Sequence, residues 1–166
     1  MRVKGIVIED FSNYKLPSMF IISTKCDFKC CKEQGLKLDI CQNSPIALKP
    51  IIDIDDATIF DFYENNDITK AVVIGGLEPF LQFEEVYELI LYFRCQKEEC
   101  DFVIYTGYYP SEIEDQINIL SCFSNVIVKY GRYIPALPSR YDDILGVTLS
   151  SNNQYAERIS NNYVGE

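Results

Sequence analysis

Four of the seven cysteines in this chain of 166 residues crowd into one short segment. They are Cys26, Cys30, Cys31 and Cys41. In a reducing compartment, clustered thiols more often bind metal than form disulfides. Thiolates are soft ligands that select zinc, copper(I) or iron–sulfur clusters. The segment therefore predicts a metal or cluster site, in preference to a group of thiols buried only as small apolar side chains.

The spacing of these cysteines favours an iron–sulfur cluster over zinc. Zinc sites usually contain paired C-x-x-C knuckles, and the segment has none. Three protein thiolates on a four-iron cluster would leave one iron free to bind a small molecule. Two ligand sets remain open: Cys26 and Cys41 together with either Cys30 or Cys31. We favour the set of Cys26, Cys30 and Cys41.

The overall composition excludes several other kinds of chemistry. The chain contains no histidine, which removes imidazole-based catalytic triads and histidine-ligated zinc. Its formal net charge of −10 argues against sequence-independent nucleic-acid binding, because the chain would repel phosphates. No apolar run reaches the ~20 residues of a membrane span. The apolar run at the start of the chain is too short, and is followed too soon by acidic residues, for a signal peptide. We expect a cytoplasmic protein.

Short apolar runs alternate with helical patterns along the chain. The predicted strands are 3–8, 19–23, 71–74, 102–106, 126–129 and 144–149, and the predicted helices are 57–65, 80–98 and 111–123. Strand–helix alternation of this kind indicates a single α/β domain over residues 1–166 with a mostly parallel sheet. By this spacing we expect an incomplete (βα)6-type barrel of about six parallel strands. The polar tail, 150–166, is expected to pack loosely.

Several small and polar residues follow the predicted strands. Because ligands bind at the carboxyl ends of parallel strands, these residues are expected to face one site. The segments are 24–26, 75–79, 106–109, 129–132 and 150–153. Gly75 and Gly76 allow a close approach of backbone to a ligand. Taken alone, they are better explained by an ordinary turn with Pro79 opening a helix, and the cysteine segment reverses that preference.

The order of these segments resembles the radical S-adenosylmethionine superfamily. Within it, the chain is most similar to the activating proteins of anaerobic ribonucleoside-triphosphate reductases. The resemblance is carried by Phe20–Cys30, Cys41–Asn43, Val72–Phe80, Tyr105–Tyr108, Gly131–Ile134 and Ser150–Gln154. Two positions depart from that pattern. Glu33 stands where the family's C-x-x-x-C-x-x-C loop has its third cysteine, and Leu77 is inserted in the Gly-Gly-Glu-Pro motif.

The resemblance implies a function for these segments. A 4Fe–4S cluster in the loop 24–45 would cleave S-adenosylmethionine to a 5′-deoxyadenosyl radical, in an anaerobic setting. The cofactor would be bound by six residues: Gly75, Gly76, Glu78, Thr106, Ser150 and Asn152. The implied partners are a glycyl-radical enzyme and an electron donor such as flavodoxin or ferredoxin. A non-catalytic 4Fe–4S electron-transfer or sensing module, and a radical enzyme acting on a peptide or small molecule, are the alternatives.

Overall fold

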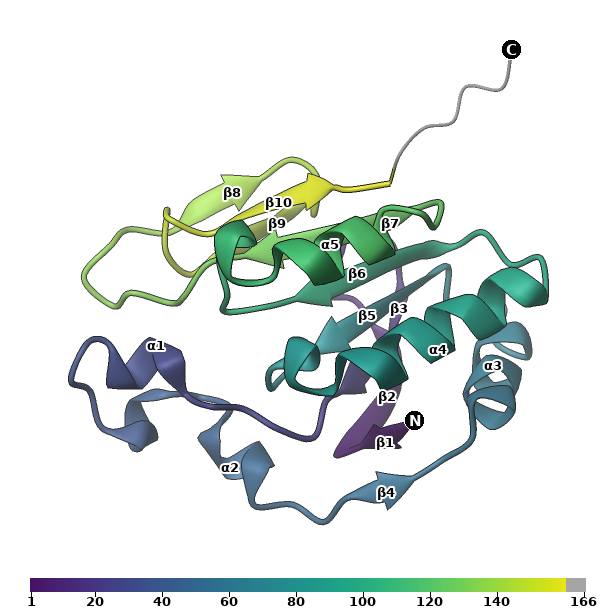
Figure 1. The fold of residues 1–166 in the computed structure, drawn as a ribbon, viewed down its shortest axis with the longest axis horizontal. Helices are drawn as coiled ribbons and strands as arrows, with labels where there is room; N and C mark the ends of the chain where they lie inside the picture. The colour runs from purple at the N-terminus through teal and green to yellow at the C-terminus, as the bar shows by residue number, and fades with distance from the viewer. Residues whose placement is uncertain (161–166) are drawn as a thin grey trace.

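The computed structural model describes residues 1–160, which form a mixed α/β domain around a six-stranded sheet (Figure 1). The strand order is β10-β7-β6-β5-β3-β2. The strands are β2 (Gly5–Asp10), β3 (Ser18–Ile22), β5 (Ala71–Gly75), β6 (Asp101–Tyr105), β7 (Val126–Tyr130) and β10 (Tyr155–Arg158). Four of them, β3, β5, β6 and β7, pair in parallel. The prediction of a mostly parallel sheet is thus confirmed for its centre.

The two edges of the sheet differ from the prediction. Both β2 and β10 pair antiparallel with their neighbours. The sheet therefore has four parallel strands and not the six that we expected. The connection between β2 and β3 is only residues 11–17, too short for the crossover that a parallel pair requires. The sheet has two open edges in this order, and an incomplete barrel is not established by it.

The predicted tail and last strand also need correction. Residues 155–158 form the edge strand β10, with Ala156 buried, so this part of the tail is packed. The predicted strand 144–149 is instead β9 (Val147–Leu149), which pairs with β8 (Arg140–Asp142) in a separate hairpin. Residues 161–166, the end of the predicted loose tail, lie outside the described residues.

Three helices cover one face of the sheet. They are α3 (Asp56–Glu64), α4 (Phe83–Cys95) and α5 (Glu114–Leu120). Asp55 caps α3 by accepting a hydrogen bond from the backbone N–H of Thr58 at 2.8 Å. In α4, the side chains of Val86, Leu89, Ile90 and Phe93 recur with helical spacing and are all buried. No helix among residues 1–160 is long and apolar enough to cross a membrane.

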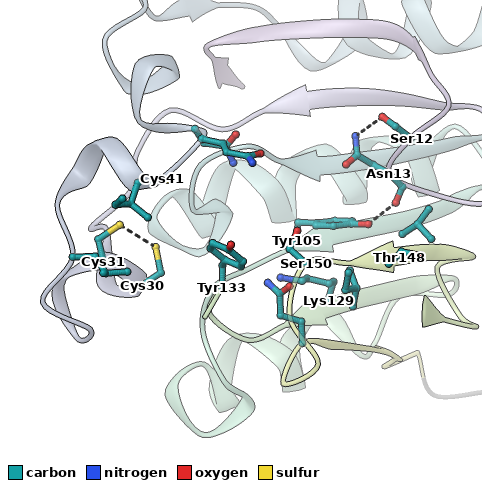
Figure 2. Close-up of a pocket in the computed structure, with 17 residues that line it drawn as sticks. Ser12, Asn13, Cys30, Cys31, Cys41, Tyr105, Lys129, Tyr133, Thr148 and Ser150 are labelled. Carbon is teal, nitrogen blue, oxygen red and sulfur yellow. Dashed lines mark hydrogen bonds between the residues drawn. The ribbon is translucent and has the colours of Figure 1, made fainter. Parts of the chain in front are cut away.

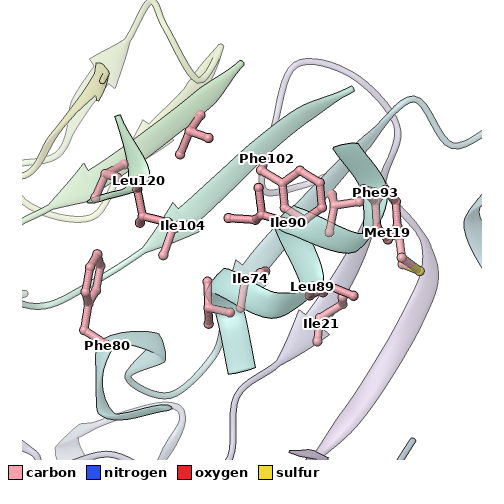
Figure 3. Packing of buried hydrophobic residues seen from close by; sticks show 14 of the residues in the cluster. Met19, Ile21, Ile74, Phe80, Leu89, Ile90, Phe93, Phe102, Ile104 and Leu120 are labelled. Atoms are coloured by element: carbon pink, nitrogen blue, oxygen red, sulfur yellow. The ribbon is translucent and has the colours of Figure 1, made fainter. Parts of the chain in front are cut away.

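The central strands are buried on both faces, which explains their continuous apolar runs. In β5, Val72 and Ile74 face the helices, while Ala71 and Val73 face a smaller cluster with Tyr14 and Leu145. Figure 3 shows the helix-side cluster, in which Phe93 packs edge-to-face on Phe102. This doubly buried sheet is the rigid support from which the loops at its carboxyl edge extend.

The remaining elements are short. The helices α1 (Lys29–Lys32) and α2 (Ser44–Ala47) and the 3₁₀ turn η1 (Leu38–Ile40) lie in the cysteine loop, which extends away from the sheet in Figure 1. Two further 3₁₀ turns, η2 (Pro79–Gln82) and η3 (Pro110–Glu112), precede α4 and α5. A two-residue pairing of β1 (Arg2–Val3) with β4 (Ile52–Asp53) fastens the end of the cysteine loop to the N-terminus.

Candidate metal centre

The first cysteine is held by the end of a buried strand. Cys26 follows β3, and the backbone before it is fixed from two directions. The Gln82 side-chain oxygen accepts hydrogen bonds from both the N–H and the hydroxyl of Thr24, each at 2.6 Å. The N–H of Glu78 donates to the carbonyl of Lys25 at 2.7 Å. These contacts join residues more than fifty positions apart and set the point where the cysteine loop begins.

The other three cysteines lie on the short elements of the loop. Cys30 and Cys31 are both in α1, with their sulfur atoms 3.9 Å apart, and Cys41 follows η1. Cys31 is the most buried of the three, with 3% of its surface exposed. Gln34 fixes α1 by donating hydrogen bonds to the carbonyls of Cys30 at 2.7 Å and Tyr133 at 2.8 Å.

Two adjoining cavities meet at these cysteines. The smaller, of about 190 Å³, is lined by Cys26, Cys30 and Cys41 and by the turns after β5, β6 and β7. The larger, of about 310 Å³, is lined by Cys30, Cys31 and Cys41 and extends toward residues of the β2–β3 connection (Figure 2). Cys30 and Cys41 line both cavities. The favoured ligand set therefore shares one cavity, and the alternative Cys31 faces only the other.

The arrangement of the thiols fits a cluster in its donor chemistry. Within residues 1–160, no three Cys, Asp or Glu side chains lie close enough together to hold a single metal ion. The thiolates of an iron–sulfur cluster bind different iron atoms, so they surround a volume instead of converging on one point. Three cysteines around one cavity can bind three iron atoms of such a cluster, one thiolate fewer than a fully ligated 4Fe–4S cluster has.

Burial and mutual proximity change the proton affinity of these thiols. Burial raises the pKa of Cys26 to about 11. Burial, followed by the neighbouring thiols of Cys31 and Cys41, raises the pKa of Cys30 to about 12. Both sulfur atoms therefore keep their protons at neutral pH until a metal competes for them, and metal binding would release protons.

Glu78 locks two of the turns beside the cysteines. Its carboxylate, only 4% exposed, accepts hydrogen bonds from the Thr106 hydroxyl at 2.7 Å and from the N–H groups of Gly107 at 2.9 Å and Phe80 at 3.2 Å. Burial raises the pKa of Glu78, although these hydrogen bonds oppose the shift. The acidic residue of the Gly-Gly-x-Glu-Pro segment thus joins the turns after β5 and β6.

The two glycines before it are required by close packing. Gly76 has a φ of 77°, and a Cβ there would lie 2.9 Å from the side chain of Ile22. A Cβ on Gly75 would lie 2.9 Å from Cβ of Tyr105 on the neighbouring strand. Both positions exclude larger residues for steric reasons, whatever ligand the turn binds.

A chain of ion pairs fastens the cysteine loop to the sheet edge. Arg132, after β7, lies 2.6 Å from Glu112 and 2.8 Å from Glu33, and Glu112 also contacts Lys29 at 2.6 Å. Hydrogen bonds from Arg132, and then from Lys29, lower the pKa of Glu112 to about 2. Glu33, at the position expected for a third cysteine, thus serves as an anchor of the loop.

The predicted cofactor-binding residues fall in different places. Gly76, Glu78 and Thr106 line the smaller cavity, and Ser150 lines the larger. Gly75 lies within β5 and lines neither cavity, and Asn152 is exposed and lines neither. The carboxyl-edge rule therefore brings most, but not all, of these residues to the cysteines.

Sequence reasoning missed Gln82, and it placed Lys129 in the segment 129–132 that faces the site without giving it a role. Gln82 holds the backbone before Cys26, and nothing in its local pattern indicated that role. Lys129 is a charged residue in the apolar strand Val126–Tyr130, and its side chain lines both cavities. A charge inside a strand that is otherwise buried was the signal that could have assigned it a role.

The fold and the thiol-lined cavity define an iron–sulfur protein built on an α/β domain. Residues 18–155 match the family model of the 4Fe-4S single cluster domain. Because this match spans most of the chain, the protein belongs to that family. Comparisons with curated proteins and with solved structures found no significant match.

Proposed function

We propose that this protein is a radical S-adenosylmethionine enzyme. The reaction is reductive cleavage of S-adenosylmethionine to methionine and a 5′-deoxyadenosyl radical, with the electron supplied by the cluster. One observation carries the proposal: Cys26, Cys30 and Cys41 share a cavity with Gly76, Glu78 and Thr106. A cluster held only for electron transfer would need no ligand site beside it.

In this proposal the chain positions its cofactor and limits access of water. The turn at Gly76 presents backbone groups to the smaller cavity, as amino acid recognition requires. Glu78 keeps that turn fixed against Thr106 and Gly107. The ion pairs of Arg132 hold the cysteine loop over the same edge. Each of these contacts exists in the protein alone, so the site is preorganised.

The proposed partners are a glycyl-radical enzyme and an acidic electron carrier such as flavodoxin or ferredoxin. Residues 24–50 contain five lysines and three acidic residues, a local charge of +2, so the rest of the chain carries −12. Lys25, Lys32, Lys37 and Lys49 are exposed. An acidic carrier would therefore be attracted to the loop that holds the cluster and repelled elsewhere.

Anaerobic reconstitution of the full chain with iron and sulfide tests the proposal. We expect reduction with dithionite in the presence of S-adenosylmethionine to yield 5′-deoxyadenosine and methionine in equal amounts. Cys26→Ala should yield neither, and Cys122→Ala, at an exposed position beyond α5, should match the wild type. Addition of the glycyl-radical partner should then give an organic radical signal by electron paramagnetic resonance.

A fully loaded and reducible cluster that forms no 5′-deoxyadenosine would overturn the enzymatic proposal. It would leave the non-catalytic electron-transfer or sensing module as the function. Product formation without a radical on the partner would instead indicate a peptide or small-molecule substrate.

A further inference from the structure

Lys129 is a buried cation without an acidic partner. Its side chain is 6% exposed, and no ion pair within residues 1–160 includes it. The ammonium donates one hydrogen bond, to the carbonyl of Gly131 at 3.1 Å, and lies 5.8 Å from the centre of the Tyr105 ring. Buried charges in proteins are normally paired. An ammonium in this state retains two N–H groups for a ligand.

The charge of Lys129 persists at neutral pH. Burial lowers its pKa to about 8, and the nearby Glu78 and Cys30 act in the opposite direction. The group therefore remains mostly protonated at pH 7. Keeping it buried and charged costs stability in the free protein, and a bound anion would offset that cost.

The linings of the two cavities indicate where such an anion would lie. The smaller cavity has a wall of mixed charge, with the acidic residues Asp27 and Glu78 beside the basic residues Lys29, Lys129 and Arg132, so an anion there would also face carboxylates. The larger cavity has no acidic residue, and Lys129 is the only charged residue that lines it. Hydroxyl groups of Thr148 and Ser150 belong to the same lining and can add hydrogen bonds.

The position of Lys129 separates the anion from the cysteines. In the view of Figure 2, Cys30 and Cys31 lie on one side of Tyr133, and Lys129 and Ser150 lie on the other. A molecule in this cavity would place its anionic end near Lys129 and extend toward the cysteines. The volume of the larger cavity, about 310 Å³, is at the lower end of the range of small-ligand sites, roughly 300 to 1,000 Å³.

We propose that the larger cavity is the substrate site and that the substrate presents a carboxylate or phosphate group to Lys129. This inference rests on the proposed function and names the chemistry of its substrate. A polypeptide substrate would supply the group from an acidic side chain or a chain terminus. A small molecule would carry it as its own anionic end.

Anion binding to the cluster-loaded protein tests the inference without measuring turnover. Malonate and inorganic phosphate are the probes for the two kinds of anion, titrated by calorimetry at constant ionic strength. We expect the preferred probe to bind the wild type and Lys129→Met to lose ~10-fold or more of that affinity. Lys70→Met, at an exposed position, is the matched control and should bind as the wild type does.

Two further measurements distinguish the alternatives. Lys129→Met should melt at or above the temperature of the wild type in chloride alone, because it removes an unpaired buried charge. Its affinity for S-adenosylmethionine, by equilibrium dialysis, should fall by less than its affinity for the anion probe, because Lys129 lines the smaller cavity together with other basic residues.

Four results would overturn the inference. The first three are no binding of either probe, equal binding by Lys129→Met, and a melting temperature of Lys129→Met below that of the wild type in chloride. A parallel loss of S-adenosylmethionine affinity would also overturn it, because Lys129 would then serve the carboxylate of the cofactor. None of these results depends on formation of 5′-deoxyadenosine, so the inference and the proposed function can fail separately.

Discussion

The sheet and the cysteine loop are held together by different forces. The strands β5 and β7 are buried along their whole length and packed on both faces. The helices α1 and α2, by contrast, are four residues long, and neither has a side-chain cap. The loop depends on ion pairs with Arg132 and Glu112 and on a few buried groups such as Cys31.

Because of this difference, the folding stability of the protein and its metal binding depend on different regions. Apolar burial stabilises the sheet without any cofactor. The loop buries little apolar surface, and side chains such as Leu48, 89% exposed, face outward. A cluster bound by the loop would therefore add order where the protein alone supplies least, and its loss should leave the sheet folded.

The largest expected effect is the loss of the cluster when Cys41, which belongs to both open ligand sets, is removed, compared with its retention when Cys31 is removed. Cys41→Ala should lose nearly all of the iron, about four atoms per chain for a 4Fe-4S cluster, because Cys41 lines both cavities. Cys31→Ala should keep its iron, because Cys31 does not line the smaller cavity. Iron and sulfide analysis after reconstitution measures both, with Cys122→Ala as the control. Loss of iron from Cys31→Ala as well would assign the ligand role to Cys31 in place of Cys30.

A change in the sheet should affect stability and not the ligands. Ile104→Ala removes a fully buried side chain from β6 and should cost about 2 to 5 kcal/mol of unfolding free energy. Leu48→Ala in the loop should change it by less than about 0.5 kcal/mol. Urea unfolding of the metal-free chain measures both. Similar losses in the two variants would mean that the loop is part of the core.

Glu78 lies between the sheet and the cysteine loop, and its substitution should have an intermediate effect on the free energy of unfolding. In Glu78→Gln, the amide NH₂ would face the N–H of Gly107 or the Thr106 hydroxyl, so one buried donor would lose its acceptor. We expect a loss of about 1 to 3 kcal/mol in urea unfolding. Glu84→Gln, at an exposed position in α4, is the control. An unchanged midpoint would show that the lock between the turns contributes nothing.

The smallest expected effect is the pH dependence of the ion pairs that Glu112 makes with Arg132 and Lys29. Because the pKa of Glu112 is lowered from 4.5 to about 2, its contribution is present above pH 4.5 and is lost as the pH falls toward 2. The difference in melting temperature between the wild type and Glu112→Gln should therefore narrow over that range. Glu114→Gln is the matched control. A difference that stays constant down to pH 2 would contradict the ion-pair explanation.

The sequence predicted much of the sheet but not its edges. Continuous apolar runs identify β3, β5, β6 and β7, because strands buried on both faces need no alternation. The antiparallel pairing of β10 with β7 was missed, because its residues are polar and its partner lies 25 or more positions away. The edges are decided by pairings that local patterns do not encode.

The sequence predicted the candidate site about as well as it predicted the sheet. The carboxyl-edge rule brought Cys26, Gly76, Glu78 and Thr106 to one cavity, because parallel strands end on the same side. It also selected Asn152, which is exposed, since the rule fixes the edge where a loop emerges and not the direction of each side chain.

The sequence by itself determined the cysteine-rich loop, the strand–helix alternation and the edge at which they meet, because each follows from residue type and local spacing. Only the tertiary structure decided which cysteines share a cavity, what Glu78 holds, and that Lys129 lies buried without an acidic partner within residues 1–160. Those features depend on contacts between residues far apart in the chain, and such contacts form only when the sheet brings its turns together.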